Sequence, residues 1–200
     1  MLLDVCLGTK SSWRILFVLA EAPGKAVERK EIQALTKSGN KVLTKFLLIL
    51  EKFGMILVEK IGRKYYYKLN LNNPFVEKLI ETINLEKTGL NNLDFSVSTI
   101  LREFVYELTN LNLENLRNVV LFGSHAKRTA SKDSDIDVAI ITEDKESNEE
   151  ILITDLIDKI KERFGKEIQP HYFTQKEFKD MKNPLVSEII KDGLFLLKGK

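Results

Sequence analysis

The sequence predicts an α+β chain in which two folded modules are joined by a helical connector. The first third of the chain combines helical periodicity with two β-rich runs around a glycine turn. The middle part reads as two amphipathic helices, and the last part alternates short apolar strands with helical stretches. We therefore expect a first module over residues 1–72, a connector over 73–111 and a second module over 112–200.

Composition excludes several classes of protein. Of the 200 residues, 44% are hydrophobic and 30% are charged, which is typical of a globular rather than a disordered chain. A single Cys argues against a disulfide scaffold or a Cys-rich zinc site, and two His leave little for a His-based metal centre. No apolar run reaches the roughly 20 residues of a membrane span, and no signal peptide is evident. We therefore expect a cytoplasmic protein without a membrane partner.

The charge is distributed unevenly along the chain. Residues 1–72 hold 13 Lys and Arg against 6 Asp and Glu, a net charge of +7. The connector carries −3 and the second module −2, so the overall charge of +2 hides a basic first module. A basic module joined to a mildly acidic one predicts different partners, with nucleic acid favoured for the first.

In the first module, the expected elements are three helices and a hairpin. Ser11 or Ser12 caps a helix that ends at Pro23-Gly24. The second and third helices are expected over residues 28–37 and 41–53, with a turn between them at 38–40. Two β-rich runs then flank the turn at 61–64 and predict a hairpin.

This order of elements, over about residues 10–70, resembles a winged helix-turn-helix domain. Such a domain sets the start of its third helix into the major groove of duplex DNA, while the hairpin wing contacts phosphate or the minor groove. The alternative is a protein-docking or dimerisation module, which the net charge of +7 disfavours. The expected DNA-binding residues are Asn40, Lys41, Thr44 and Lys45 on the third helix, and Arg63 and Lys64 at the wing tip.

The connector is expected to hold two amphipathic helices. Pro74 lies near the first position of one helix, and residues 96–111 make the other. These helices pack either on one module or between two copies of the chain, so a homodimer is compatible with them. Neither carries a recognisable chemical pattern.

The chemistry is concentrated in the second module. A buried strand over residues 118–122 leads into Gly123 and Ser124, which are suited to donate hydrogen bonds to a phosphate. Asp135 and Asp137 begin the next strand and share one face, because side chains at i and i+2 point the same way. Two such carboxylates repel each other unless a cation lies between them, and Mg²⁺ (or Mn²⁺) prefers oxygen ligands.

The joint pattern of strand, Gly-Ser, short helix, Ser-Asp-x-Asp and apolar strand resembles the nucleotidyltransferase superfamily that includes DNA polymerase β. Within it, residues 112–200 are similar to the minimal nucleotidyltransferases, including the closing helix and tail strand. The resemblance implies an α/β domain with a small mixed sheet and transfer of a nucleoside monophosphate from an NTP, most simply ATP, to a hydroxyl. It implies catalysis and metal binding by Asp135 and Asp137, and nucleotide binding by Gly123, Ser124, Lys127 and Arg128.

The resemblance also implies partners. Minimal nucleotidyltransferases are often paired with small helical HEPN proteins in toxin–antitoxin systems, in which the partner is a candidate for the modified substrate. At about 90 residues, the module has little room for an elaborate acceptor site. The expected function is therefore Mg²⁺-dependent nucleotidyl transfer to a hydroxyl, with a protein partner as a candidate acceptor and DNA bound through the first module.

Two positions depart from the family pattern. Arg128 stands where many members have Gly, and Gln169 stands where a third carboxylate is expected, on the strand after a helix over residues 148–163. Gln cannot take up a proton, whereas Glu167 and His171 share its face of the strand. Either two carboxylates suffice, or activity is reduced, or the domain only binds nucleotide. The last option predicts a DNA-binding transcriptional regulator with an inactive nucleotide-binding domain.

Overall fold

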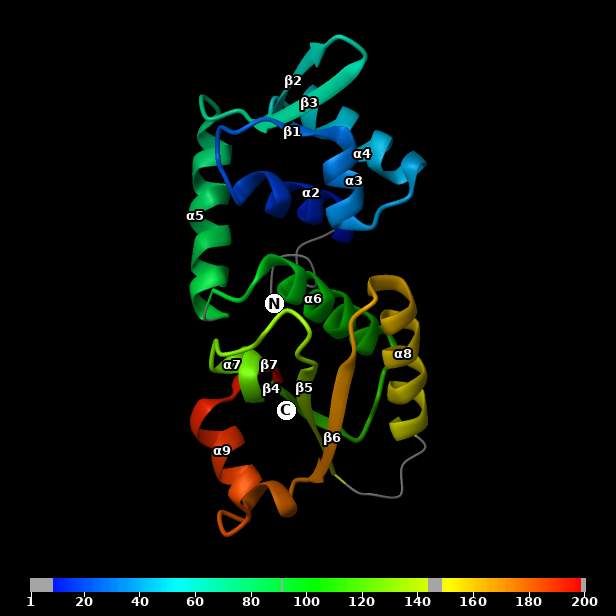
Figure 1. Ribbon diagram of the computed structural model, residues 1–200, viewed down its shortest axis with the longest axis vertical. Coiled ribbons are helices and arrows are strands. Elements are labelled where there is room, and N and C mark those ends of the chain that lie inside the picture. The colour runs from blue at the N-terminus through cyan, green and yellow to red at the C-terminus, as the bar shows by residue number, and fades with distance from the viewer. Residues whose placement is uncertain (1–8, 91, 144–148, 199–200) are drawn as a thin grey trace. The chain divides into compact units, whose positions relative to one another are not determined.

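The computed structural model describes residues 9–90, 92–143 and 149–198 and divides the chain into two compact units, residues 2–89 and 90–200 (Figure 1). Each unit combines helices with a small sheet, so the α+β prediction is confirmed. The two helices of the expected connector fall one in each unit. No helix among the described residues is long and apolar enough to cross a membrane.

The first unit contains the predicted helices and hairpin. Left-handed Lys37 (φ 51°) ends the second helix, and Gly39 precedes the third, which produces the sharp turn between them. A two-residue strand pairs with the second strand of the hairpin and completes an antiparallel sheet of order β1-β3-β2. The elements are α2 (Lys10–Ala20), β1 (Val27–Glu28), α3 (Arg29–Thr36), α4 (Asn40–Lys52), β2 (Ile56–Ile61), β3 (Lys64–Leu69) and α5 (Pro74–Gly89).

The core of this unit forms where the apolar stripes of its helices meet the sheet. Leu19 on α2, Ile32 on α3 and Leu43 on α4 are fully buried. Helix α5 contacts α2, buries Val76 and Ile83, and joins it through Lys87, whose Nζ lies 2.6 Å from a carboxylate oxygen of Glu21. The first connector helix therefore packs on the helices of the first unit.

The second unit is built on one four-stranded sheet of order β6-β5-β4-β7. Strands β5 and β6 are parallel and the other pairs are antiparallel, so the small mixed sheet is confirmed. Asn148, the first residue of the predicted long helix, lies outside the described residues. The elements are α6 (Phe95–Asn110), β4 (Leu116–Leu121), α7 (Gly123–Ala126), β5 (Ile136–Thr142), α8 (Glu149–Phe164), β6 (Ile168–Thr174), a 3₁₀ turn (Glu177–Lys179), α9 (Pro184–Asp192) and β7 (Leu194–Lys198).

Local signals in the sequence explain where the helices of this unit begin. The Asp94 carboxylate accepts hydrogen bonds from the Ser96 amide (2.8 Å) and the Ser96 hydroxyl (2.6 Å) and caps α6. The bond from the hydroxyl is the main cause that lowers the pKa of Asp94. Asn183 caps α9 in the same way, with Pro184 at the first helical position. On one face of the sheet, Ile189 of α9 belongs to the same buried cluster as Val120 and Ile141 of the two central strands, so α9 covers the middle of the sheet.

Candidate functional site

The two predicted metal-binding carboxylates lie where β4 ends and β5 begins. Asp135 is exposed and immediately precedes β5, whereas Asp137 is the second residue of that strand, with a side chain 24% exposed. The Phe122 amide donates a hydrogen bond to the carbonyl of Asp137 (3.0 Å), which ties the end of β4 to the start of β5. The structure therefore brings Gly123 and Asp137 together, with Asp135 two residues before Asp137.

Gly123 is required at this junction for two independent reasons. Its φ of +68° is one that residues with a side chain rarely adopt. A Cβ atom at this position would also lie 2.3 Å from Oδ2 of Asp137, far inside van der Waals contact. The sequence suggests that Gly123 admits a phosphate; the structure adds that it admits the Asp137 carboxylate.

A buried imidazole braces the loop that precedes Asp135. His125 in α7 is 8% exposed, and its Nε2 lies 3.1 Å from the carbonyl oxygen of Ser134. The Ser134 hydroxyl in turn accepts a hydrogen bond from the amide of Ser131 (2.9 Å). His125 thus positions the residue next to Asp135, a task that its place in the sequence does not reveal.

The electrostatics of the site disfavour the ionised form of Asp137. Burial at the junction is the main cause that raises the pKa of Asp137 above its ordinary value, and the charges of Asp135 and Glu188 add to it. His171 and His125 act in the opposite direction. In the metal-free site, the ionised Asp137 carboxylate is therefore partly buried without enough positive charge around it. A divalent cation would offset the free-energy cost of this burial.

Strand β6 brings three candidate side chains beside β5. Gln169 is the register partner of Asp137 and is exposed. Glu167 is turned to another partner, because its Oε2 accepts a hydrogen bond from Lys161 (2.7 Å). His171 is the one of the three with a recorded contact to Asp137, with 3.9 Å between its Nε2 and Asp137 Oδ1.

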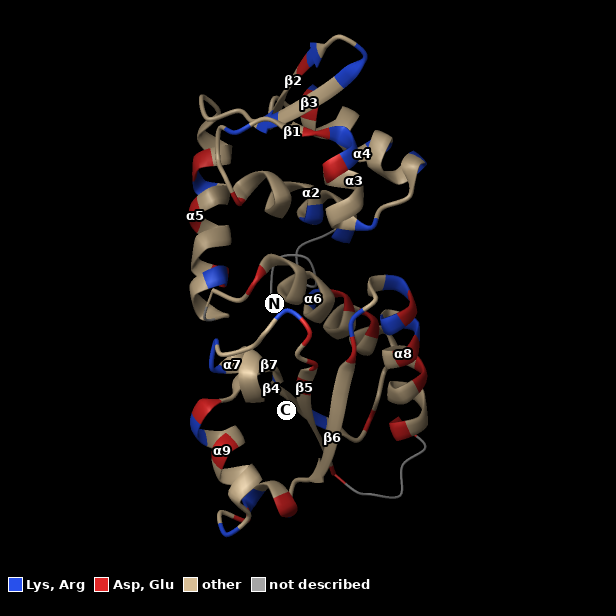
Figure 2. Cartoon of the chain, in the orientation of Figure 1, with Lys and Arg blue, Asp and Glu red and all other residues tan. Residues whose placement is uncertain are grey.

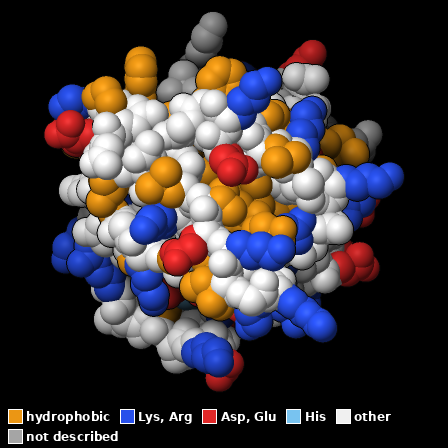
Figure 3. Space-filling view, turned by 90° about the horizontal axis from the view of Figure 1, so that it is seen from above, with side chains coloured by type: hydrophobic (Ala, Val, Ile, Leu, Met, Phe, Trp, Pro, Cys, Tyr) orange, Lys and Arg blue, Asp and Glu red, His pale blue; other side chains and the backbone are white. Residues whose placement is uncertain are grey.

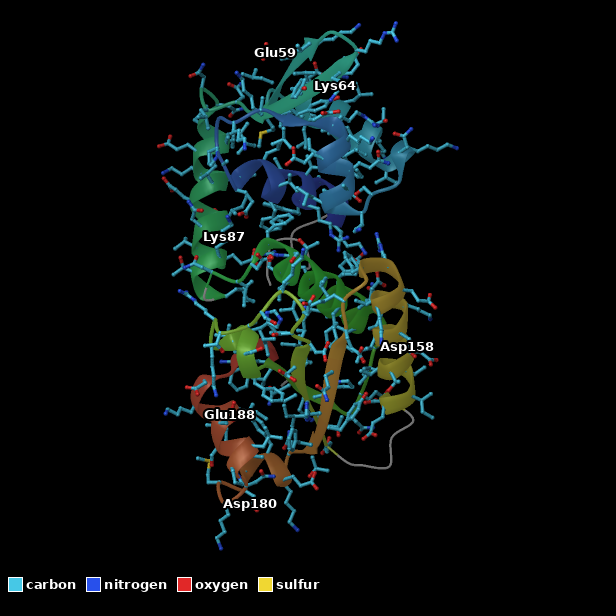
Figure 4. All side chains as sticks on the ribbon, in the orientation of Figure 1. Glu59, Lys64, Lys87, Asp158, Asp180 and Glu188 are labelled. Carbon is cyan, nitrogen blue, oxygen red and sulfur yellow. The ribbon has the colours of Figure 1, made fainter. Side chains whose placement is uncertain are left out.

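The two basic residues predicted to bind nucleotide differ in their surroundings. Lys127 lies 2.7 Å from Glu188 and 3.9 Å from Asp192, both on α9, and the bond to Glu188 raises the pKa of Lys127 (Glu188 is labelled in Figure 4). Arg128 is exposed and has a φ of +59°. Arg128 therefore holds a left-handed backbone, which costs a residue with a side chain about 1–2 kcal/mol.

The residues present fit a divalent cation that is completed by other ligands. Within residues 9–90, 92–143 and 149–198, no three His, Cys, Asp or Glu side chains converge as a ready-made metal site. Mg²⁺ in nucleotide-dependent enzymes is commonly held by one or two carboxylates together with substrate phosphates and water. Asp135 and Asp137 supply such a pair, and the Gly123 junction holds one of them in place.

In the first unit, hydrogen bonds hold two of the predicted DNA-binding residues, Asn40 and Thr44, in place at the start of α4. The Arg29 guanidinium donates to Oδ1 of Asn40 (2.6 Å) and to Oγ1 of Thr44 (2.8 Å), and so joins the starts of α3 and α4. Lys41 and Lys45 are exposed on α4. Sequence reasoning missed Arg29 because its partners lie 11 and 15 residues away, beyond any local pattern.

Lys and Arg residues, blue in Figure 2, also occur along the β2–β3 hairpin. Arg63 is exposed at its turn, whereas Lys64 donates to Glu28 (2.8 Å), a bond that raises the pKa of Lys64. Figure 3 shows Lys and Arg side chains lying among exposed hydrophobic ones. Leu48 on α4 and Phe53 just after it are 57% and 73% exposed, which keeps protein docking as the alternative for this unit.

Comparison with known proteins assigns a family resemblance to the second unit. Residues 107–199, a little under half of the chain, match the family model described as polymerase beta, nucleotidyltransferase. This match supports membership of the nucleotidyltransferase superfamily for that part of the chain. No curated protein matches the sequence.

Several solved structures share local similarity with the chain. A toxin–antitoxin complex with AMP-PNP is 23% identical over 48% of this chain and 72% of that one, with a TM-score of 0.36. A complex of tri-AMPylated HEPN toxin and MNT antitoxin from Shewanella oneidensis is 21% identical over 48% and 67%, with a TM-score of 0.32. TrmBL2, an archaeal chromatin protein, is 14% identical over 94% and 72%, with a TM-score of 0.31. These TM-scores are too low to support an argument.

Proposed function

We propose that the second unit transfers a nucleoside monophosphate from an NTP, most simply ATP, to a hydroxyl group, with Mg²⁺ or Mn²⁺ held by Asp135 and Asp137. The observation that carries the proposal is the junction at which Asp137 fits against the bare Cα of Gly123, inside the segment that matches the family model. The raised pKa of Asp137 is also typical of a functional rather than a structural carboxylate.

The roles of the remaining residues follow from their places around this junction. The Gly123 amide and the Ser124 hydroxyl donate hydrogen bonds to triphosphate oxygens, and Arg128 adds positive charge beside them. Lys127 contributes less direct charge, since Glu188 partly neutralises it. A divalent ion, when bound, supplies charge neutralisation and alignment of the attacking and leaving oxygens.

The acceptor we propose is a hydroxyl on a protein partner of the HEPN type, which makes the chain the antitoxin of a toxin–antitoxin pair. The resemblance to minimal nucleotidyltransferases supports this choice. The size of the segment that matches the family model supports it too, because about 90 residues leave little surface for a dedicated small-molecule acceptor site.

Replacing Asp135 with Ala is expected to lower nucleotidyl transfer by about 10³-fold, since several kcal/mol of charge stabilisation are lost. The measurement is transfer of label from [α-³²P]ATP to protein in a cell extract, compared with the wild-type chain. Glu143→Ala, an exposed residue just after β5, serves as the control and retains activity. Equal labelling by wild type and Asp135→Ala, or no labelling by either, contradicts the proposed transfer.

We propose in addition that the first unit binds duplex DNA through the start of α4 and the hairpin turn. The support is the net charge of +7 over residues 1–72 and the exposed positions of Lys41, Lys45 and Arg63. The Arg29 bridge to Asn40 and Thr44 preorganises this surface, because fewer rotamers remain to be ordered on binding.

Replacing Arg63 with Ala is expected to reduce the slope of log K against log[salt] by about 0.9, the value for one lost phosphate contact. Binding to a random duplex at several salt concentrations, measured by fluorescence anisotropy, checks this. Lys78→Ala removes an equally exposed cation from α5, where it pairs with Glu81, and leaves the slope unchanged. A salt-independent affinity, or equal slopes for wild type and Arg63→Ala, argues against the DNA surface.

One observation favours a second candidate, a DNA-binding regulator that holds nucleotide without turnover. The register partner of Asp137 is the amide Gln169 rather than a carboxylate that takes up a proton. This candidate predicts ATP binding by calorimetry together with no label transfer by the wild-type chain.

A further inference from the structure

We propose that His171 supplies a nitrogen ligand beside Asp137, so that the metal site of this chain selects Co²⁺ or Mn²⁺ over Mg²⁺ more strongly than an all-oxygen site does. The inference rests on the proposed function in one respect, that Asp137 binds a divalent ion. It goes beyond that function because it assigns a residue and a metal preference that the family resemblance does not supply.

The distance between the two side chains is close to that expected for a shared ion. Nε2 of His171 lies 3.9 Å from Oδ1 of Asp137, too far for a hydrogen bond. Nitrogen and oxygen ligands lie about 2.0–2.2 Å from a divalent transition metal, so two atoms at adjacent positions on one ion are separated by roughly 3–3.5 Å. The observed spacing is a few tenths of an ångström wider, so the two side chains have to approach each other slightly to bind one ion.

The Nε2 atom of His171 is also a buried polar atom without a hydrogen-bond partner among the described residues. It has almost no solvent exposure. Buried polar atoms in folded proteins are nearly always paired, because an unpaired one loses its hydration without compensation. A metal bond to this nitrogen satisfies it.

The orientation of the ring is fixed by its surroundings. His171 packs edge-on against Phe122, with 5.0 Å between ring centroids and 73° between ring planes. The Phe122 amide also donates to the main-chain carbonyl of Asp137, so Phe122 contacts the His171 ring and the backbone of Asp137. Such support holds the imidazole next to the carboxylate before any ion arrives.

The neighbouring candidates are less suited to supply this ligand. The other imidazole of the chain, His125, has its Nε2 within hydrogen-bond distance of the Ser134 carbonyl. Glu167 is engaged by Lys161, and Gln169 is exposed and brings only a neutral amide. The structure thus assigns the position next to Asp137 to a nitrogen donor, where the resemblance leads one to expect a carboxylate.

Metal preference follows from the donor atom. Mg²⁺ favours oxygen ligands and gains little from imidazole, whereas affinity for N/O sites rises from Mn²⁺ to Co²⁺ and Ni²⁺. Any carboxylate site binds Co²⁺ more tightly than Mg²⁺, so the ratio of the two affinities in the wild type does not by itself test the proposal. The diagnostic quantity is the change in that ratio when His171 is replaced.

The test is isothermal titration of the full chain with Co²⁺ and with Mg²⁺. His171→Gln keeps a polar side chain but removes the imidazole, and it is expected to weaken Co²⁺ binding about tenfold or more and Mg²⁺ binding less than about threefold. Tyr172→Phe is the matched control, since Tyr172 is the next residue of β6 and its hydroxyl contacts Thr154 on α8 (3.2 Å). It leaves both affinities unchanged. Equal changes for the two metals in His171→Gln overturn the proposal.

A second measurement uses the wild-type chain, so it does not depend on the folding of a variant. Pulsed EPR of Mn²⁺ bound to the wild-type chain is expected to show coupling to a directly bound ¹⁴N nucleus, and its absence overturns the proposal. Asp137→Asn distinguishes a failure of the proposed metal site from a failure of the proposed role of His171. If this variant binds metal as the wild type does, the metal site of the proposed function fails; if it loses binding while His171→Gln keeps the wild-type ratio, only the role of His171 fails.

Discussion

Replacement of Asp137 by Asn is expected to abolish nucleotidyl transfer and, at the same time, to stabilise the metal-free protein at neutral pH. The loss of activity is about 10³-fold or more, because the amide carries no charge to offset a cation. The gain in stability follows from burial, which raises the pKa of Asp137 and makes its ionised form costly in the folded state. A residue kept for packing alone would show the opposite, a loss of stability.

The pH dependence of this effect has a definite sign. With a raised pKa, the folded state holds its proton on Asp137 to higher pH than the unfolded chain does, so stability falls as pH rises from the ordinary value of 3.8 through the raised one. Below this window, the wild type and Asp137→Asn are expected to have nearly equal stability. Above it, the variant unfolds at the higher temperature, and thermal unfolding at pH 3 and pH 7 without metal checks both ends.

Asp135→Asn provides the control for this comparison. Asp135 is exposed, so neutralising it removes activity without a gain from relieved burial. Added Mg²⁺ or Mn²⁺ is expected to raise the unfolding temperature of the wild type and not that of Asp137→Asn. If Asp137→Asn is less stable than the wild type at pH 7 in the absence of metal, the electrostatic account of the site is wrong.

Replacement of Gly123 by Ala is expected to remove activity and to destabilise the second unit by about 2–5 kcal/mol. About 1–2 kcal/mol arises from the left-handed backbone, and about 1–3 kcal/mol more from the methyl group that meets the Asp137 carboxylate at 2.3 Å. Urea unfolding followed by circular dichroism measures the sum. Relief of this contact displaces Asp137, so metal-dependent transfer is lost as well.

The chain offers a matched control in Gly165, which ends α8. Its φ is also +68°, but an added Cβ meets nothing within 4 Å. Gly165→Ala is therefore expected to show only the backbone cost of about 1–2 kcal/mol and to retain activity. The difference between the two variants measures the contact with Asp137.

A double substitution tests the source of that difference. In Gly123→Ala with Asp137→Ala, the methyl group no longer meets a carboxylate, so the cost is expected to fall close to that of Gly165→Ala while transfer stays absent. Equal costs for Gly123→Ala in the presence and absence of the Asp137 carboxylate contradict the packing described at the junction.

The sequence predicted the architecture of both units because their elements have clear local signals. The hairpin is flanked by β-rich runs, and Asp137 lies on the predicted strand, β5, whereas Asp135 precedes that strand, so the period of two along a strand does not govern its side chain. The two-residue strand β1 was missed, since a segment so short has no periodicity to detect. Elements with their own periodicity are thus predictable, and those created by pairing are not.

The parts of the site that sequence reasoning left open depend on contacts between distant residues. The pairing of Lys127 with Glu188 spans 61 residues, and it becomes visible only when α7 and α9 are in place. The position of His171 depends on the parallel register of β5 and β6, which sets Gln169 opposite Asp137 and His171 opposite Ala139. Which of several residues on one strand face meets a catalytic carboxylate is a tertiary property.

The central place of β5 in its sheet has a consequence for amide hydrogen exchange. Asp137 lies on a strand with a neighbour on each side, whereas Asp135 precedes the strand in a loop that is braced by one imidazole. Exchange along the paired part of β5 then requires the sheet to open, while the loop exchanges through smaller fluctuations. The two carboxylates therefore lie on either side of a boundary in backbone protection, one on the strand and one in the loop before it.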